Sequence, residues 1–334
     1  MTKLFIYVAI TLALFAIGYM VRVYEIASNI RGKKQHIVTD EDNRKMGKLM
    51  FTFLFVLFAF VSWTLITCVP KMLPQAASET GATLDWLFNF NMAILFFVFT
   101  ITHIFLFYFA YKYYGRTGRT ATYFPHNNKL EMIWTVIPAI VLAVIIIFGL
   151  KAWTKITAPC SKDAIVIQLY AKQFDWTARY AGKDNLLGES NYKLITDENT
   201  LGMDNKDSKC NDDIIVKNEI HIPLGKEVEF KLNSRDVIHS AFMPHFRAQM
   251  NCVPGMTTMM HFTPIITTAQ MREKLNNDKF DYILLCNKIC GASHYNMQMT
   301  IVVDTEDDYK AWLSKQPTYK QQITPAATPP VASK

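Results

Sequence analysis

The amino-acid sequence predicts a membrane-anchored, all-β protein, with four transmembrane helices followed by one β-sandwich or β-barrel domain. Three observations carry this prediction. Long apolar runs fill the first half of the 334-residue chain, short β-type runs separated by turn residues fill the second, and the charge balance changes where the two halves meet.

Four apolar runs of about 18–21 residues lie at positions 4–21, 50–69, 91–111 and 132–152. Runs of this length cross a hydrocarbon core of about 30 Å as helices, whereas buried helices of soluble proteins are shorter and carry a polar face. The first run lies where a secretory signal would, but the sequence still carries it behind Met1, so we expect a retained anchor. We therefore divide the anchor into two additional N-terminal helices at 1–70 and a helical hairpin at 90–152.

Basic residues are concentrated in two of the three loops between these runs. The first loop and its flanks hold Arg22, Arg31, Lys33, Lys34, Arg44, Lys45 and Lys48, and the third loop holds Lys112, Arg116, Arg119 and Lys129. The second loop has only Lys71. Because cytoplasmic loops carry the excess of Lys and Arg, we expect the first and third loops in the cytoplasm and both termini on the other side. In a bacterium this arrangement gives a multi-pass inner-membrane protein whose folded domain lies in the periplasm.

The charge balance argues against a nucleic-acid partner. Fourteen basic and seven acidic residues precede Trp153, so the excess behind the formal net charge of +7 belongs to the membrane half, where it sets the topology among lipids. The second half is nearly neutral up to Pro317 and has no basic stripe or nucleic-acid motif.

Six β-type runs lie in the second half, at 165–170, 214–222, 227–232, 257–262, 282–286 and 297–303. Their spacing is typical of an antiparallel sandwich or barrel. We expect a surface insertion at 184–213, a short amphipathic helix at 307–314 and a disordered tail at 321–334, where Pro and Ala are frequent. These boundaries give one folded domain at 160–305, followed by a short helix and a tail at 306–334.

The candidate site is the loop between the last two β-type runs. Twelve residues there hold two cysteines, a histidine and a methionine, which are Cys286, Cys290, His294 and Met297. Two thiolates, an imidazole and a thioether form a soft set of ligands that selects copper. A tight loop lets both sulfurs bridge the same two metal ions, and each ion then needs a terminal ligand.

A second imidazole must come from elsewhere in the chain. Three of the eight histidines lie in inner loops or in a membrane run and cannot reach the folded domain. The remaining candidates are His221, His239, His245 and His261. His221 and His261 lie within β-type runs, where a side chain on the sheet surface is the simpler interpretation. His239 lies just past such a run, where a loop can meet the cysteine loop, and His245 is the second choice.

Four blocks of the sequence, taken in order, resemble subunit II of the haem-copper cytochrome c oxidases. They are the run from Glu131 to Ala139, the motif Asp236-Val237-x-His239-Ser240, the segment from Pro244 to Met256, and the motif Cys286-x-x-x-Cys290-Gly291-x-x-His294-x-x-Met297. The resemblance covers residues 91–304. The first two helices lie outside the usual two-helix anchor of the family.

The resemblance implies a cupredoxin domain that holds a binuclear copper centre, CuA. Carried over residue by residue, the ligands are two bridging thiolates, two imidazoles, a thioether and a backbone carbonyl, supplied by Cys286, Cys290, His239, His294, Met297 and Lys288. His239 and Met297 would complete one copper, and His294 with the Lys288 carbonyl would complete the other.

The implied function is one-electron transfer within a terminal oxidase. Electrons would arrive from a cytochrome c and leave to haem in the catalytic subunit I, which works with other oxidase subunits to reduce oxygen to water and pump protons. The sequence assigns no role to the two extra helices, and covering another lipid-facing surface or docking a neighbouring complex in a larger respiratory supercomplex are both open alternatives. No haem is expected in this chain, because it has no Cys-x-x-Cys-His motif.

Several alternatives have different ligand requirements. A mononuclear blue-copper carrier uses a single cysteine, and the quinol-oxidase relatives of this fold have lost the copper ligands. A membrane-anchored copper chaperone would need neither Met297 nor the motif around His239. A CuA subunit of a nitric oxide reductase remains an open alternative.

Two positions depart from the pattern of the family. Lys288 replaces a Glu whose side chain is associated with magnesium, and because an ammonium cannot ligate a cation, no magnesium is expected here. Phe174 replaces the first Trp of the aromatic run through which electrons are accepted, whereas Trp176 is kept. Trp176 and Tyr295 are therefore candidates for the electron path, although burial in the core is the simpler interpretation for each.

Three further residues are singled out. Glu131, at the cytoplasmic start of the fourth helix, is either a carboxylate at the membrane interface or, as the resemblance implies, a proton-uptake group for the catalytic subunit. Cys160 and Cys210 would be able to form a disulfide in an oxidising compartment, but the sequence alone leaves this pairing undecided.

Overall fold

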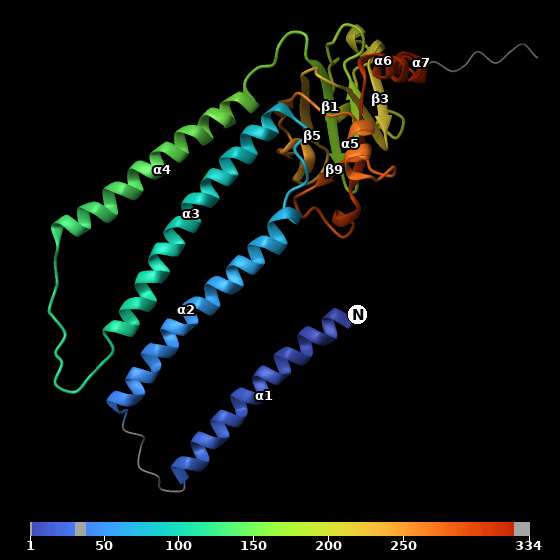
Figure 1. Ribbon diagram of the computed structural model, residues 1–334. Helices are drawn as coiled ribbons and strands as arrows, with labels where there is room; N and C mark the ends of the chain where they lie inside the picture. The colour runs from blue at the N-terminus through green and yellow to red at the C-terminus, as the bar shows by residue number, and fades with distance from the viewer. Residues whose placement is uncertain (1, 31–37, 324–334) are drawn as a thin grey trace, which may run out of the picture. The chain divides into compact units, whose positions relative to one another are not determined.

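The structure is a computed structural model that describes residues 2–30 and 38–323 (Figure 1). Its first half contains the helices α1 (Thr2–Ile30), α2 (Asp40–Cys68), α3 (Glu79–Lys112) and α4 (Asn128–Thr157). All four are long and apolar enough to cross a membrane, which confirms the predicted number of membrane-spanning helices. The helices are longer than the apolar runs because polar ends extend them. At the start of α4, for example, the side chain of Asn127 caps the helix by accepting the N–H of Leu130 at 2.9 Å.

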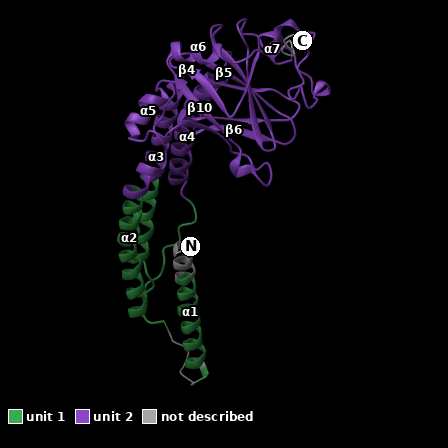
Figure 2. Ribbon diagram, turned by 90° about the vertical axis from the view of Figure 1, so that its right-hand side faces the viewer, with its two compact units in different colours: residues 1–65, 97–126 green, residues 66–96, 127–334 purple. Residues whose placement is uncertain are grey.

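The chain divides into two compact units, residues 1–65 with 97–126 and residues 66–96 with 127–334 (Figure 2). Within the first unit, the carboxylate of Asp40 accepts hydrogen bonds from the N–H and the hydroxyl of Thr117 at 2.9 and 3.1 Å. Gly47 lets α2 approach α3 closely, because a Cβ at this position would lie 3.3 Å from the Tyr114 ring. These contacts tie α2 to the second half of α3 and to the loop that follows it.

Ten strands form the folded part of the second unit. They are β1 (Ile165–Lys172), β2 (Asp175–Tyr180), β3 (Ile214–Lys217), β4 (Glu219–Pro223), β5 (Val228–Ser234), β6 (His239–Met243), β7 (Ala248–Cys252), β8 (Thr258–Phe262), β9 (Tyr282–Cys286) and β10 (Gln298–Asp304). They make two five-stranded sheets with the orders β3-β2-β1-β5-β8 and β4-β10-β9-β6-β7. Neighbouring strands are antiparallel except for the pairs β1–β5 and β4–β10, which are parallel. The predicted β-sandwich is thus confirmed.

The short helix η1 (Val69–Lys71) follows α2. The other short helices connect or follow the strands, and they are η2 (Tyr192–Leu194), η3 (Ser208–Asn211), η4 (Pro244–Phe246), η5 (His294–Asn296), α5 (Thr268–Leu275), α6 (Glu306–Ser314) and α7 (Tyr319–Ile323). The amphipathic helix expected at 307–314 is α6. Residues 321–323 of the expected tail lie in α7 instead, and residues 324–334 lie outside the described part of the chain.

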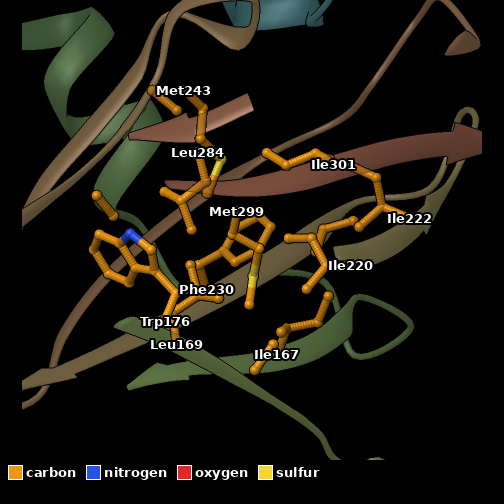
Figure 3. Close-up of a cluster of buried hydrophobic side chains, with 14 of the residues drawn as sticks. Ile167, Leu169, Trp176, Ile220, Ile222, Phe230, Met243, Leu284, Met299 and Ile301 are labelled. Atoms are coloured by element: carbon orange, nitrogen blue, oxygen red, sulfur yellow. The ribbon is translucent and has the colours of Figure 1, made fainter. Parts of the chain in front are cut away.

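The core of the sandwich is filled by apolar side chains from both sheets (Figure 3). Along β5, for example, buried and partly exposed residues alternate, as expected for a strand with one face in the core. The first sheet contributes Ile167, Leu169, Trp176 and Phe230, and the second contributes Ile220, Ile222, Met243, Leu284, Met299 and Ile301. Burying each large side chain of this kind stabilises the fold by roughly 1.5–3 kcal/mol, so the core holds the two sheets face to face.

The sequence did not reveal all of these elements. The run expected at 214–222 is two strands in different sheets, because Asn218 between them adopts a left-handed conformation with a φ of 72°. The strands β2, β6 and β7 and the helix α5 were not predicted. Each of these three strands has five or six residues and contains polar positions that weaken its alternating pattern.

The insertion at 184–213 has a small apolar core of its own. Leu201, Met203 and Cys210 are buried there together with Tyr319 of α7. Arg179 of β2 donates through Nε to a carboxylate oxygen of Asp213 at 3.0 Å, and both side chains are almost fully buried. A buried ion pair is costly to break from one side, so this contact anchors the insertion to the first sheet.

Candidate metal centre

The loop between β9 and β10 holds four of the residues expected to bind copper. β9 ends at Cys286, β10 begins at Gln298, and the two strands pair antiparallel. The backbone N–H of Cys286 donates to the carbonyl of Met297 at 3.0 Å, which closes the loop at its base. A loop held at both ends by strand pairing presents its side chains in one arrangement.

The sulfur atoms of this loop converge on one buried point. The Sγ atoms of Cys286 and Cys290 are 3.8 Å apart, and both residues are buried. Nδ1 of His294 lies 3.6 Å and Sδ of Met297 lies 4.0 Å from Cys290 Sγ. The carbonyl oxygen of Lys288 lies 3.3 Å from Cys286 Sγ, whereas the residue as a whole is exposed. The Lys288 backbone therefore faces the sulfurs while its side chain is in solvent.

His239 brings the second imidazole to these sulfurs. It is the first residue of β6 and not a loop residue, as had been expected, and β6 pairs with β9 so that Ala241 lies opposite Cys286. Nδ1 of His239 lies 3.7 Å from Cys286 Sγ, and the residue is fully buried. Strand register, and not a flexible loop, thus places this histidine. We call His239, Cys286, Cys290, His294, Met297 and the Lys288 carbonyl the copper cluster.

The other candidate histidines lie elsewhere in the domain. The ring of His245, the second choice, packs edge-to-face on Phe280 and Tyr282, with centroid distances of 5.1 and 5.2 Å. The ring of His221 stacks on Trp312 at 4.1 Å. The geometry therefore joins His239, and not its runner-up, to the cysteines.

Asp236 holds the His239 ring in place. Its Oδ1 lies 2.8 Å from His239 Nε2. Burial acts to raise the pKa of Asp236, but hydrogen bonds from the N–H of Gln173 and from the His239 ring outweigh it and lower the pKa. The ionised carboxylate accepts the Nε2 proton and leaves the Nδ1 lone pair facing the sulfur, which is the tautomer that a metal ligand needs. This role of Asp236 was not predicted, although its position three residues before His239 was a usable signal.

The Cys290 thiol holds its proton more tightly than a free cysteine does. Burial, together with the neighbouring Cys286 thiol, raises the pKa of Cys290 to about 11. A thiol with this pKa is protonated at neutral pH and is a poor nucleophile. A metal ion would displace the proton to obtain the thiolate. The raised pKa of Cys290 therefore argues against a nucleophilic cysteine at this position.

The turn between β1 and β2 covers the ligand loop. A Cβ on Gly291 would lie 2.8 Å from the Phe174 ring, so glycine is required for this close approach. Gly291 also has a φ of 142°, which side-chain-bearing residues rarely adopt. The side-chain amide of Gln173 donates to the carbonyl of Cys290. The first sheet thus contacts the ligand loop of the second.

Trp176 lies beside the cluster and is completely buried, with an exposed fraction of 0%. Its indole N–H points to the carbonyl of Met297 at 3.5 Å, and its ring meets His239 edge-to-face at 6.4 Å. Another protein cannot touch this ring, so Trp176 is a core residue that also braces two residues of the cluster. The large exposed side chains of the ligand loop are Ile289 and Tyr295, which are 88% and 85% exposed.

Two predicted features lie away from the copper cluster. Glu131 is exposed in the first turn of α4, a 30-residue helix that spans about 45 Å and leads into the β domain at its other end. Cys160 follows that end, whereas Cys210 lies beside the Arg179 guanidinium. Both cysteines are free thiols, so the disulfide considered between them is not formed.

Comparisons with known proteins cover most of the chain. The family described as cytochrome C oxidase subunit II, transmembrane domain, matches residues 70–152, and the periplasmic domain of the same subunit matches residues 165–305. An alternative cytochrome c oxidase subunit 2 of Bradyrhizobium diazoefficiens is 36% identical over 238 residues, which are 71% of this chain and 81% of that protein. A cytochrome c oxidase subunit 2 of Thermostichus vulcanus is 28% identical over 288 residues, or 78% of this chain and 81% of that protein.

Among solved structures, the periplasmic domain of subunit II of the cytochrome oxidase of Bradyrhizobium japonicum aligns with 46% of this chain and 94% of its own, at 21% identity and a TM-score of 0.31. The two family matches take in α3, α4 and all ten strands and leave α1 and α2 outside. With both domains of the family matched in order, and with a relative 36% identical over 71% of the chain, this chain belongs to the cytochrome c oxidase subunit II family, the electron-transfer subunit of haem-copper oxidases.

Proposed function

We propose that this chain holds a binuclear copper centre, CuA, that relays single electrons from a cytochrome c to haem in the catalytic subunit of a haem-copper oxidase. In that complex the catalytic subunit would reduce oxygen to water and pump protons. One observation carries the proposal. Two thiols, two imidazole Nδ1 atoms, a thioether and a backbone carbonyl converge on one point, with distances of 3.3–4.0 Å between each donor and a cysteine sulfur.

The arrangement of the donors fits two bridging sulfurs. The proposed terminal pairs are His239 with Met297 for one copper, and His294 with the Lys288 carbonyl for the other. Within each pair, one donor lies beside Cys286 Sγ and the other beside Cys290 Sγ. A pair divided in this way between the two sulfurs is what we expect if each sulfur serves both metal ions. A set of soft donors also matches copper better than a hard cation.

A bound copper pair would supply reversible one-electron chemistry at nearly constant geometry. The residues of this chain would hold the ligands still and exclude water. Asp236 fixes the ring of His239 through Nε2, and Gln173 holds the Cys290 carbonyl. Trp176 fills the space behind Met297 without exposed surface. These contacts favour a rigid site, in which little reorganisation accompanies a change of charge.

The outer side of the ligand loop offers a surface for the electron donor. Ile289 and Tyr295 are exposed there, next to the ligands Cys290 and His294 in the sequence. Two exposed apolar side chains fit a transient contact with another protein, because such contacts need little buried area. We propose that the cytochrome c docks on this loop, with Trp176 as a buried brace and not as the point of contact.

The membrane setting follows from the four apolar helices and the distribution of charge. We propose that they anchor the chain in the bacterial inner membrane with the β domain in the periplasm, in line with the matched periplasmic domain. Glu131, exposed at the opposite end of α4 from the β domain, would then lie near the cytoplasmic face. There it is available as a proton-uptake group for the catalytic subunit.

The test is copper loading of the full chain in detergent. We expect two coppers per chain and an electron paramagnetic resonance spectrum in which one unpaired electron couples to two equivalent copper nuclei. A single copper with coupling to one nucleus would overturn the proposal. The same result would favour a copper carrier or chaperone.

The partner is tested in the purified complex. Oxygen uptake driven by reduced cytochrome c is expected to require the copper-loaded chain. Consumption of nitric oxide with no oxygen uptake would instead assign the chain to a nitric oxide reductase.

A further inference from the structure

A second cluster of metal-binding side chains lies on the first sheet. Cys160 comes from the linker between α4 and β1, Glu227 directly precedes β5, and His261 lies in β8. One ligand atom from each residue lies within 4.8 Å of the other two. The neighbours Val228 and Phe262 point into the core, so Glu227 and His261 lie on the outer face of the sheet. We call Cys160, Glu227 and His261 the zinc cluster.

Hydrogen bonds of the backbone hold the linker beside Glu227. The N–H of Ser161 donates to Glu227 Oε2 at 2.9 Å. The N–H of Ile165 donates to the backbone carbonyl of Glu227, also at 2.9 Å. Because Ser161 follows Cys160 directly, these bonds fix the thiol next to the carboxylate and leave Oε1 facing the histidine. The site is therefore assembled before any ion arrives.

One of the two ring nitrogens of the buried His261 has no hydrogen-bond partner among the described residues. The residue is 8% exposed, and its Nδ1 lies 2.8 Å from Glu227 Oε1. Its Nε2 is buried and has no hydrogen-bond partner within the described part of the chain. A buried ring nitrogen without a partner loses the free energy of a hydrogen bond to water. Because the two ring nitrogens point in different directions, an ion held by Nε2 would lie away from Glu227, whereas an ion shared with Glu227 would take the place of the proton between Nδ1 and Oε1.

The electrostatics of the cluster favour a cation. Glu229 lies directly opposite His261 in the pairing of β5 with β8, so its side chain is on the same face of the sheet. The carboxylates of Glu227 and Glu229 act electrostatically on the Cys160 thiol, and Lys231 acts in the opposite sense. Two carboxylates beside a thiol make a site in which a divalent ion would be stabilised and would convert the thiol to the thiolate.

We propose that Cys160, Glu227 and His261 bind a zinc ion. The donor set of one thiolate, one imidazole and one carboxylate is typical of zinc, with water or a further carboxylate in the fourth position. Neighbouring donors around a tetrahedral zinc ion are about 3.3–3.6 Å apart, given bonds of about 2.0–2.3 Å. The three ligand atoms lie within 4.8 Å of one another, and a zinc ion would draw them to this spacing. A carboxylate and a single thiolate make the site harder than the copper cluster, so zinc is favoured over Cu⁺.

The zinc ion would pin the linker between the last membrane helix and the sandwich. α4 contacts β8, and the partly buried Ile156 at its end packs on the apolar core of the sandwich. Cys160 follows four residues later and reaches the outer face of β5 and β8. A metal ligand on each side of this junction would restrain the angle at which α4 enters the domain. This role does not depend on copper or on electron transfer.

The test uses the full chain, first loaded with copper so that the copper cluster does not take up zinc. After equilibration with Zn²⁺ and removal of loosely bound ions, we expect one zinc per chain by elemental analysis. Zinc should also protect Cys160 from alkylation and raise the midpoint of thermal unfolding. Co²⁺ in place of zinc should give a thiolate-to-cobalt absorption band.

Substitution of a ligand should weaken zinc binding while the copper spectrum persists. Loss of residues that merely orient metal ligands costs about 10–100-fold in metal affinity. Loss of a ligand itself is therefore expected to cost at least about 100-fold in zinc affinity. The first variant is Cys160→Ser, and His261→Gln replaces it if Cys160→Ser does not fold. Cys68→Ser, which removes an exposed thiol at the end of α2, is the matched control and should bind zinc as the unaltered chain does.

Two outcomes would overturn the proposal. The first is that the unaltered chain retains no zinc, or retains copper at Cys160 in its place. The second is that zinc binds equally well to the unaltered chain, Cys160→Ser and His261→Gln, since the ion would then lie elsewhere.

Discussion

Two histidines in the same domain each contact one carboxylate, yet their surroundings differ. His239 gives Nε2 to Asp236 and turns Nδ1 towards a thiol, within a group of three sulfur atoms. His261 gives Nδ1 to Glu227 and keeps a buried Nε2 without a partner, near one thiol and two carboxylates. The histidine–carboxylate pair is common to both, so it does not decide which metal is preferred. The softness of the remaining donors decides which metal each cluster prefers.

The largest difference in copper binding should appear when one cysteine is replaced by serine, first in the copper cluster and then in the zinc cluster. Cys290→Ser is expected to abolish the spectrum of the binuclear copper and the oxygen uptake supported by cytochrome c, because Cys290 lies next to Cys286, His294 and Met297. Cys160→Ser should leave both unchanged. Copper content and the resonance spectrum of each variant measure the difference. Loss of the copper signal in Cys160→Ser would show that the two clusters are not independent.

The next effect concerns the carboxylate that braces His239. Asp236→Asn should weaken copper retention by about 10–100-fold, because an amide holds the imidazole less firmly and no longer supplies a negative charge. Asp278→Asn, at an exposed position after α5, is the control. Competition for copper with a chelator of known affinity gives the copper affinity of each variant relative to the unaltered chain. Equal retention in both variants would mean that the Asp236 contact does not position the ligand.

Gly291→Ala tests the contact between the two sheets at the ligand loop. Backbone strain alone is expected to destabilise the fold by about 1–3 kcal/mol. The contact of the new Cβ with the Phe174 ring should add to this loss. Gly255→Ala is the matched control, since its φ of 81° is also left-handed but a Cβ there meets nothing within 4 Å. Thermal unfolding measures the stability that Gly291→Ala and Gly255→Ala each lose. Adding Phe174→Ala should recover only the part of the loss that is due to the contact.

A smaller effect should depend on pH in the zinc cluster. Burial acts to raise the pKa of Glu227, but hydrogen bonds from Ser161 and His261 outweigh it, so the pKa lies below its ordinary value of 4.5. The ionised carboxylate therefore stabilises the folded state above pH 4.5, and this contribution is lost as the pH falls through the lowered pKa.

In chelator-treated protein, Glu227→Gln should thus have a lower unfolding midpoint than the unaltered chain above that pH. The two midpoints should converge in more acidic solution. Glu273→Gln, at an exposed position in α5, is the control for the loss of a carboxylate elsewhere in the domain. A constant difference for Glu227→Gln would argue against an ionised Glu227 as the source of the stability.

Lys288→Ala should have the smallest effect. Only the carbonyl of Lys288 faces the copper cluster, so the copper content and spectrum are expected to remain the same. Loss of copper would show that the side chain, too, supports the site. Addition of Mg²⁺ should alter neither the unaltered chain nor the variant, because position 288 offers an ammonium where a carboxylate would be needed.

The sequence predicted those features that depend on local patterns. The four helices were predictable from the length of the apolar runs, and the candidate metal loop from two cysteines, a histidine and a methionine within twelve residues. His239, preferred among the histidines of the domain, does lie beside the cysteines, but the reason given for its position was incomplete. Its position results from the pairing of β6 with β9, and neither the strand β6 nor this register was apparent in the sequence.

The zinc cluster was not predictable for the same physical reason. Cys160, Glu227 and His261 are separated by tens of residues, and each has an ordinary explanation when considered alone. His261 was expected to lie on a sheet surface, and it does. Only the parallel pairing of β1 with β5 and the antiparallel pairing of β5 with β8 bring the three side chains together. Such pairings depend on the whole core and leave no local signature.

The distance in sequence between His239 and Cys286, which is 47 residues, bears on the order in which the centre is assembled. A chain still emerging from the ribosome presents the segment with His239 before the cysteines. β6 can pair with β7 first, but it lies beside Cys286 only once β9 has paired with its other edge. Long-range pairings of this kind form late in folding. Copper delivered to the folded domain would therefore meet every ligand at once, whereas copper delivered earlier would meet only those of the loop between β9 and β10. Metal delivery after folding is the route that this topology favours.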